Sequence, residues 1–174
     1  MLTLHRVPDS DSLVVEGARI AAIGPYEELY SAYGERARVR EWDGVLGPGR
    51  HEPDAVALLE HAYWPDPREA DELGTAPLTG DALAALGMTD TRWGASARRG
   101  VQRLLASGTT TLAGPVSRPA VRLAVERSGL KYAAGPRALA VGGPADFAVF
   151  ADDGTCLVTV LDGRLVHRRR RPGA

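Results

Sequence analysis

The sequence predicts a mixed α/β protein, in which a small β-sandwich is built from both chain ends and an α/β segment is inserted between them. Three observations predict this class. Short β-branched runs with glycine turns occupy both ends, runs with helical spacing of apolar residues fill the middle, and the middle contains one strand–helix–strand succession. We expect the β-domain to cover residues 1–47 and 138–174, and the insertion to cover residues 48–137.

The N-terminal part is typical of strands interrupted by one helix. Residues 2–6 are a short alternating run, and the β-branched runs 12–16 and 18–23 predict a tight hairpin. Apolar residues at helical spacing predict a helix over 26–33. Residues 37–42 alternate between apolar and charged side chains, as in a half-exposed strand.

The insertion begins with helices. The sequence Asp66-Pro67-Arg68-Glu69 combines an Asp N-cap, a Pro at the first helical position and a Glu at the third, which is a helix-start signature. A short helix is predicted over 81–86 and a long one over 91–107, with Gly108 following it. We expect Arg98, Arg99 and Arg103 to form a solvated face of the long helix.

The rest of the insertion and the C-terminus complete the pattern. A strand over 109–113, a helix over 118–127 and a strand over 130–134 predict a βαβ unit with parallel strands. Strands follow at 147–150, 156–161 and 164–167, and the last two flank Asp162-Gly163, a strong hairpin signal. The arginine tail at 168–171 is predicted to be a solvated terminus, with contact to an acidic partner as the alternative.

Composition narrows the classes of function. Of the 174 residues, 44% are hydrophobic and 25% are charged, and the formal net charge is −1, so we expect no membrane and no nucleic acid as a partner. No run of about 18 apolar residues is present, and the N-terminus does not have the pattern of a signal peptide. Cys156 is the single cysteine, expected to be buried in its strand. These features predict a cytoplasmic protein.

Several stretches together resemble the amidohydrolase superfamily, imidazolonepropionase and its relatives in particular. They are "SLVVEGARIAAIGPYEEL", "VLGPG", "GVQRLLASGTTTLAGP", and "LAVGGPADFAVFADDG" followed by "VTVLDGRLVHRR". The resemblance implies a composite β-sandwich made by both chain ends beside a metal-bearing TIM barrel. It covers about half the chain, and the pairing of its first and last motifs in this order is its most specific part.

The chain departs from this family where the metal would bind. The resemblance implies a His-x-His pair on the first barrel strand, and the corresponding positions here are near Asp54 and Val56. The family also has a bridging lysine or glutamate and later histidines, yet Lys131 is the only lysine and no histidine lies between His61 and His167. A (β/α)8 barrel takes at least about 200 residues, so the insertion corresponds to a barrel fragment.

Four polar residues after the "GPG" turn are the candidates for a new site. His51, Glu52, Asp54 and His61 have the chemistry of zinc ligands, with His51, Asp54 and His61 as the metal alternative. The spacing of His51 and Asp54 also suits one polar face at a helix N-terminus, and a pocket without metal is the third possibility. We expect no resident cofactor, with zinc as the alternative.

The segment 60–72 is the other candidate, because it combines Tyr63 and Trp64 with acidic residues and prolines. It is either a surface loop with Trp64 anchored on the core or a recognition loop for a partner or ligand. The chain has no G-x-S-x-G elbow, and neither of its glycine turns matches a phosphate-binding or dinucleotide-binding fingerprint.

The leading hypothesis is a non-catalytic, amidohydrolase-like protein that binds a protein or small molecule as an accessory factor. The rival is a reduced metal-dependent hydrolase acting on non-peptide carbon–nitrogen bonds. A parallel sheet of two or three strands has open edges, so a homodimer through the insertion is also expected.

Overall fold

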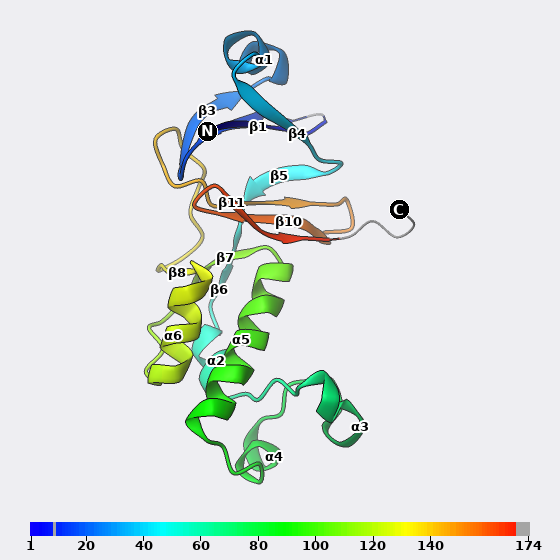
Figure 1. Cartoon of the computed structure of the whole chain (residues 1–174), viewed down its shortest axis with the longest axis vertical. Helices are drawn as coiled ribbons and strands as arrows, with labels where there is room; N and C mark the ends of the chain where they lie inside the picture. The colour runs from blue at the N-terminus through cyan, green and yellow to red at the C-terminus, as the bar shows by residue number, and fades with distance from the viewer. Residues whose placement is uncertain (9, 170–174) are drawn as a thin grey trace. The chain divides into compact units, whose positions relative to one another are not determined.

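The computed structural model describes residues 1–8 and 10–169, and the chain divides into two compact units (Figure 1). Unit 1 comprises Met1–Arg50, Leu105–Thr110 and Pro136–Ala174, and unit 2 comprises His51–Leu104 and Thr111–Gly135. The fold is mixed α/β, as predicted, and the described strands form three open sheets without a closed barrel. Residues 170 and 171 of the arginine tail lie outside the described residues.

The first sheet of unit 1 has the strand order β3-β2-β1-β4. Strand β2 pairs antiparallel with both β1 and β3, whereas β4 pairs parallel with β1 because helix α1 carries the chain across the sheet before β4 begins. The elements are β1 (Leu2–Arg6), β2 (Ser12–Glu16), β3 (Arg19–Gly24), α1 (Tyr26–Tyr33) and β4 (Ala37–Glu41).

The second sheet of unit 1 joins one strand from the N-terminal part to three from the C-terminus. Its order is β11-β10-β9-β5, with every neighbouring pair antiparallel. Asp162 and Gly163 both have positive φ, 48° and 71°, which is the backbone of a type I′ hairpin turn. The strands are β5 (Val45–Pro48), β9 (Phe147–Phe150), β10 (Cys156–Leu161) and β11 (Arg164–Arg168).

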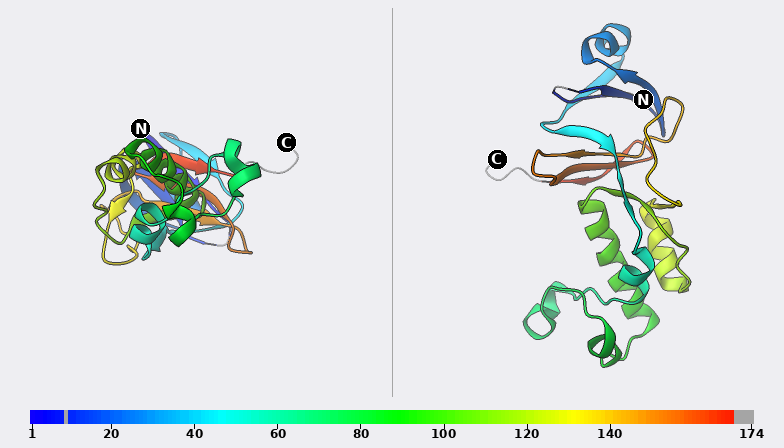
Figure 2. Two further views of the ribbon diagram at one scale, coloured as in Figure 1. Left: turned by 90° about the horizontal axis from the view of Figure 1, so that it is seen from below. Right: turned by 180° about the vertical axis from the view of Figure 1, so that it is seen from behind.

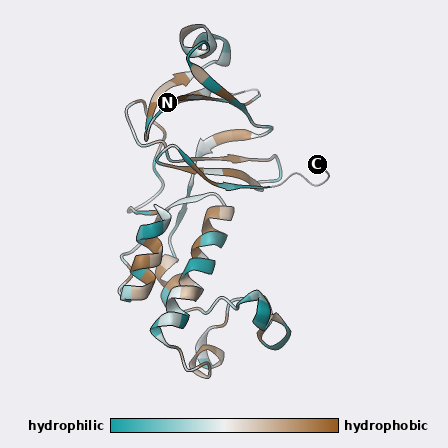
Figure 3. Cartoon of the chain, viewed as in Figure 1, coloured by the Kyte–Doolittle hydropathy of each residue, from teal (hydrophilic) through white to brown (hydrophobic). Residues whose placement is uncertain are grey.

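Both sheets contribute to one hydrophobic core. Leu13 and Val15 of the first sheet belong to the same buried cluster as Phe147, Val149 and Val158 of the second. The opposite face of the first sheet forms a second cluster beneath α1, which lies on its outer side in Figures 1 and 2. In Figure 3 hydrophobic colour recurs along the strands of both sheets, whereas β4 and β11 also carry hydrophilic stretches. Burial of alternate side chains on two faces therefore accounts for the alternating patterns in the sequence.

The second sheet is covered on its other face by residues 105–110 of the same unit. The Thr159 hydroxyl donates a hydrogen bond of 2.6 Å to the Leu105 carbonyl. Beside it, Cys156 is buried, and its Sγ lies 3.3 Å from the Thr159 hydroxyl. The prediction of a buried strand cysteine is confirmed.

Unit 2 is mainly helical. The boundary between the two units falls within α5, β6 and β7, so each of these elements has residues in both units. The third sheet has the order β6-β7-β8, and β7 and β8 are parallel with α6 between them, which confirms the predicted βαβ unit. Within the described residues, no helix is both long and apolar enough to cross a membrane. The elements are β6 (Arg50–Glu52), α2 (Ala55–Glu60), the 3-10 helix η1 (Pro67–Glu69), α3 (Ala70–Leu73), α4 (Gly80–Ala84), α5 (Asp90–Ala106), β7 (Thr109–Leu112), α6 (Pro119–Ser128) and β8 (Lys131–Tyr132).

Candidate functional site

The carboxyl ends of strands β6, β7 and β8 form one edge of the sheet in unit 2. Proteins with parallel sheets bind their ligands at this edge, so it is a candidate site. The three strand ends are held together by backbone bonds. The Ala113 N–H donates to the Glu52 carbonyl at 2.9 Å, and the Ala133 N–H donates to the Leu112 carbonyl at 3.0 Å. The candidate residues His51, Glu52 and Asp54 lie on or just after the first of these strands.

The structure corrects the expectation that His51 and Asp54 share one helical face. His51 is half-buried on strand β6, where its Nδ1 lies 3.1 Å from the Thr111 hydroxyl. Asp54 is exposed and immediately precedes α2, and its N–H donates to the Glu52 carboxylate at 3.0 Å. Val56, the other position matched to the paired histidines, lies in α2 rather than on a strand.

His61 is separated from these residues by helix α2. It is exposed at the C-terminus of that helix, where its backbone N–H donates to the Ala57 carbonyl at 3.2 Å. Across the described ranges 1–8 and 10–169, no three His, Cys, Asp or Glu side chains gather in a group able to hold a metal ion. In the part of the chain that the structure describes, the side chains therefore do not assemble the metal centre that the amidohydrolase resemblance implies.

A residue that the sequence did not single out, Glu60, binds the segment that connects strand β7 to helix α6. Its side chain is at the end of α2 and the residue is only 4% exposed. One carboxylate oxygen accepts the Ser117 N–H at 2.6 Å and also the Arg118 N–H, and the other accepts the Ser117 hydroxyl at 3.0 Å. Because α6 has no side-chain cap of its own, Glu60 supplies the negative charge that its N-terminus favours.

The loop between β7 and α6 is also held from strand β8. The Val116 N–H donates to the Tyr132 hydroxyl at 3.4 Å, and Val116 itself is buried. Burial raises the pKa of Tyr132 above its ordinary value, so its hydroxyl keeps its proton at neutral pH. Glu60, Ser117 and Tyr132 are thus engaged in joining α2, α6 and β8.

Trp64 is anchored between helices of unit 2. Its indole N–H donates to the Leu58 carbonyl and its backbone N–H donates to the Ser96 hydroxyl, both at 2.9 Å. Gly100 of α5 makes this approach possible, since a Cβ there would lie 2.7 Å from the indole nitrogen and 2.8 Å from a Leu59 methyl. These contacts favour the anchoring interpretation of Trp64 over a free recognition loop.

The arginines of α5 do not all face solvent as predicted. Arg98 is exposed, but Arg99 is half-buried and donates to the Trp64 carbonyl at 2.7 Å. The guanidinium of Arg103 lies 5.0 Å from the centre of the Trp64 ring. The solvated-face prediction is therefore wrong for Arg99 because the 60–72 segment covers that side of α5.

Glu69 ties the same segment together. It completes the predicted capping box by accepting the Asp66 N–H at 3.0 Å, and it also accepts the Tyr63 hydroxyl at 2.5 Å and Arg92 at 3.0 Å. The hydrogen bond from Tyr63, followed by that from the Asp66 backbone, lowers the pKa of Glu69. Burial raises the pKa of Tyr63. The carboxylate therefore stays ionised and accepts all three bonds at neutral pH.

We expect Glu69→Gln to loosen residues 63–74 without unfolding the chain. The amide has one acceptor oxygen, so it cannot receive both the Tyr63 hydroxyl and Arg92 as the carboxylate does. Limited proteolysis should cut this segment faster in the variant than in the wild type. Glu72→Gln is the matched control in the same segment, and equal cleavage of both variants would contradict the role of Glu69.

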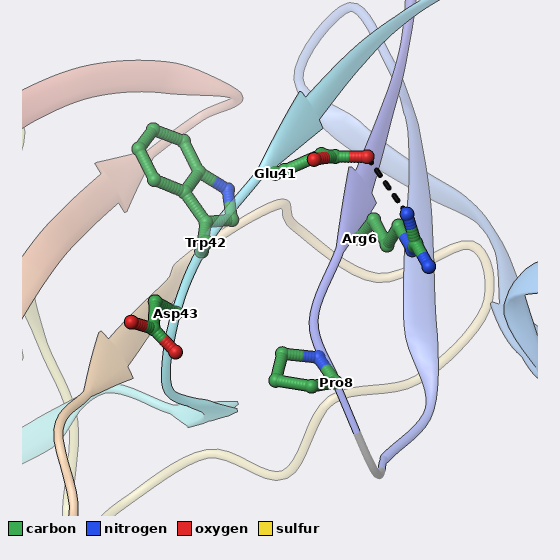
Figure 4. A pocket seen from close by; sticks show the side chains of 5 residues that line it. All are labelled: Arg6, Pro8, Glu41, Trp42 and Asp43. Atoms are coloured by element: carbon green, nitrogen blue, oxygen red, sulfur yellow. Dashed lines mark hydrogen bonds and ion pairs between the residues drawn. The ribbon is translucent and has the colours of Figure 1, made fainter.

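Unit 1 contains a separate hollow of about 230 Å³ (Figure 4). It is lined by Arg6, Pro8, Glu41, Trp42 and Asp43. Arg6 and Glu41 form an ion pair of 2.8 Å across neighbouring strands. The Trp42 indole N–H donates to Nδ1 of the buried His5 at 3.1 Å, which fixes the ring at the end of β4.

Comparison with known proteins gives matches among solved structures only. No protein-family model and no curated protein sequence matches the chain. The solved structures that it resembles in part are amidohydrolase-superfamily members, and the chain spans about a third of their length.

Three of these structures show the extent of the similarity. Ochratoxinase from A. niger is 17% identical over 75% of this chain and 29% of its own, with a TM-score of 0.48. Guanine deaminase from E. coli is 17% identical over 70% and 29%, also with 0.48. N-isopropylammelide isopropylaminohydrolase from Burkholderia multivorans is 17% identical over 76% and 36%, again with 0.48.

Proposed function

We propose that this chain is an amidohydrolase-like protein that acts without catalysis, as a binding or accessory protein. One observation carries the proposal, namely the use of the Glu60 carboxylate to hold Ser117 and Arg118 at the carboxyl edge of the parallel strands. An enzyme of this architecture needs its polar groups at that edge free to meet a substrate. Here the buried carboxylate is committed to a structural role.

The architecture supports the amidohydrolase-like part of the proposal. We infer that the two sheets of unit 1 form the composite β-sandwich that the sequence resemblance implies, since both contribute to one buried cluster. We also infer that unit 2 corresponds to the first strands and helices of a reduced barrel. The homodimer through the insertion stays a prediction.

The alternative is a reduced metal-dependent hydrolase acting on non-peptide carbon–nitrogen bonds. One observation favours it, because His51 and Glu52 lie on the strand that leads to this edge. A metal held there would need further ligands drawn from Asp54 or His61, which are both exposed. The two proposals therefore differ in whether purified protein retains a metal.

Elemental analysis distinguishes them. We expect purified protein to carry far less than one zinc, iron or manganese ion per chain, and His51→Ala to leave that content unchanged. Ammonia release from cyclic amides and amino-substituted heterocycles should not exceed the buffer rate, before or after incubation with each metal. Stoichiometric metal that is lost in His51→Ala, but kept in the exposed-residue control Asp81→Asn, would overturn the proposal.

A further inference from the structure

Strand β4 in unit 1 forms one edge of the first sheet and leaves backbone groups open. The Trp42 N–H donates to the Arg6 carbonyl on β1, and backbone groups point to alternate sides along a strand. The N–H and C=O groups of Val39 and Glu41 therefore point away from β1, outward from the sheet. Among the described residues, no hydrogen bond reaches these outward groups.

The two faces of β4 differ in chemistry. Val39 and Tyr33 both pack against the apolar cluster beneath α1. Arg38 and Arg40 lie on the opposite face, where the strand register sets Arg40 beside His5. A segment added along this edge would therefore meet an apolar row on one face and two guanidinium groups on the other.

Arg38 and Arg40 give this face of β4 a positive charge. In the part of the chain that the structure describes, neither Arg38 nor Arg40 forms an ion pair, and Arg40 is half-buried. The neighbouring carboxylate of Glu41 is paired with Arg6. Arg168 adds a further cation at the end of the edge, 5.6 Å from the centre of the Trp42 ring. Carboxylates supplied by a partner would find these arginines available.

The charges of Arg38 and Arg40 also decide which kind of segment can pair with this edge. If a second copy of this chain paired through β4, arginines would lie opposite arginines, and like charges in facing positions destabilise a sheet. A purely apolar strand would leave the arginines without partners. An extended segment that alternates acidic and apolar residues satisfies both faces and the open backbone groups.

We propose that the outer edge of β4 is a docking site for an acidic, extended segment of a partner protein, which adds to the first sheet as a further strand. Its carboxylates pair with Arg38 and Arg40, and its apolar side chains lie beside Val39 and Tyr33. This site lies in unit 1, so it does not depend on whether the strand ends of unit 2 are catalytic.

Binding of synthetic peptides to the full chain tests the proposal. The probe is a fluorescent peptide of about seven residues that alternates glutamate and valine, long enough for one short strand. Fluorescence anisotropy should show saturable binding that weakens as salt is added. A lysine–valine peptide should not bind. A glutamate–valine peptide with one central valine replaced by proline should bind at least about tenfold more weakly, since it lacks a backbone donor.

A charge exchange locates the site. The double variant Arg38→Glu and Arg40→Glu should bind the acidic peptide at least about tenfold more weakly and should now bind the lysine–valine peptide. Arg98→Glu, at an exposed arginine of unit 2, is the matched control and should behave as the wild type. Gain of lysine–valine binding also shows that the double variant is folded.

Hydrogen exchange shows whether the peptide adds as a strand. The amides of Val39 and Glu41 should exchange more slowly when the acidic peptide is bound. The proposal is overturned if the acidic peptide does not bind, if the proline peptide binds equally well, or if Arg98→Glu weakens binding as much as the double variant. Protection that appears elsewhere and not at β4 would overturn it as well.

Discussion

Glu60→Ala is expected to lower the free energy of unfolding by about 3 kcal/mol, because hydrogen bonds to a buried charged acceptor are among the costliest to remove. The substitution deprives the Ser117 N–H, the Ser117 hydroxyl and the Arg118 N–H of their acceptor at once. It also leaves the N-terminus of α6 without its negative charge. The substitution therefore removes the hydrogen bonds that join α2 to the start of α6.

Urea denaturation followed by circular dichroism measures this loss. Glu60→Gln keeps the volume and one acceptor oxygen, so we expect it to be less destabilising than Glu60→Ala. Glu52→Ala is the control, because Glu52 is half-exposed and accepts a single backbone N–H. If Glu60→Ala were no more destabilising than Glu52→Ala, the carboxylate would not be holding this edge together.

The second large effect is a loss of stability as the pH falls from about 6.5 to about 4. Burial, followed by the charge of Arg40, lowers the pKa of His5 from 6.5 to about 4. His5 is 2% exposed, lies between Trp42 and Phe147, and accepts the Trp42 indole N–H on Nδ1. The folded state therefore holds the imidazole neutral.

The direction follows from proton uptake. Above pH 6.5 the imidazole is neutral in both states, and between the two pKa values only the unfolded chain takes up the proton. Unfolding is thus favoured progressively as the pH falls to about 4. Over this range the free energy of unfolding decreases by about 3 kcal/mol. Burial, followed by the charge of Arg169, also lowers the pKa of His167, which acts in the same direction.

Urea midpoints measured at several pH values check this expectation. The slope of stability against pH between 4 and 6.5 should be smaller in His5→Gln, whose amide does not titrate, whatever its absolute stability. His61→Gln is the control, because it removes an exposed histidine instead of a buried one. An equal slope in wild type and His5→Gln would show that His5 does not hold a lowered pKa.

Much of the fold could be predicted because its signals are local. Asp162 and Gly163 adopt the positive φ angles that their hairpin turn needs, and the capping box begins at Asp66 as predicted. The predicted length of a strand was wrong where that length depends on the neighbouring strand in the sheet. The apolar run predicts a strand over 130–134, but strand β8 covers only Lys131–Tyr132. Its one described neighbour is β7, which ends at Leu112, so the later residues of the run have no strand to pair with.

The candidate site was harder to predict, because side-chain partners are chosen across the fold. The spacing of His51 and Asp54 suits one helix face, yet His51 lies on a strand beside Thr111, 60 residues away. Glu60 looked like one acidic residue among several in the 60–72 segment. Only the packing of α2 against α6 buries it beside Ser117, 57 residues further along the chain.

The sequence by itself determined the turns, the helix starts, the alternation of the strands and the βαβ unit, since these depend on backbone preferences and on spacing within a few residues. Tertiary structure alone decided which side chains meet. It set β4 at a sheet edge with Arg38 and Arg40 on one face, and it committed Glu60 to the start of α6. The reason is physical, because burial and charge pairing depend on distances in space, which separation along the chain does not specify.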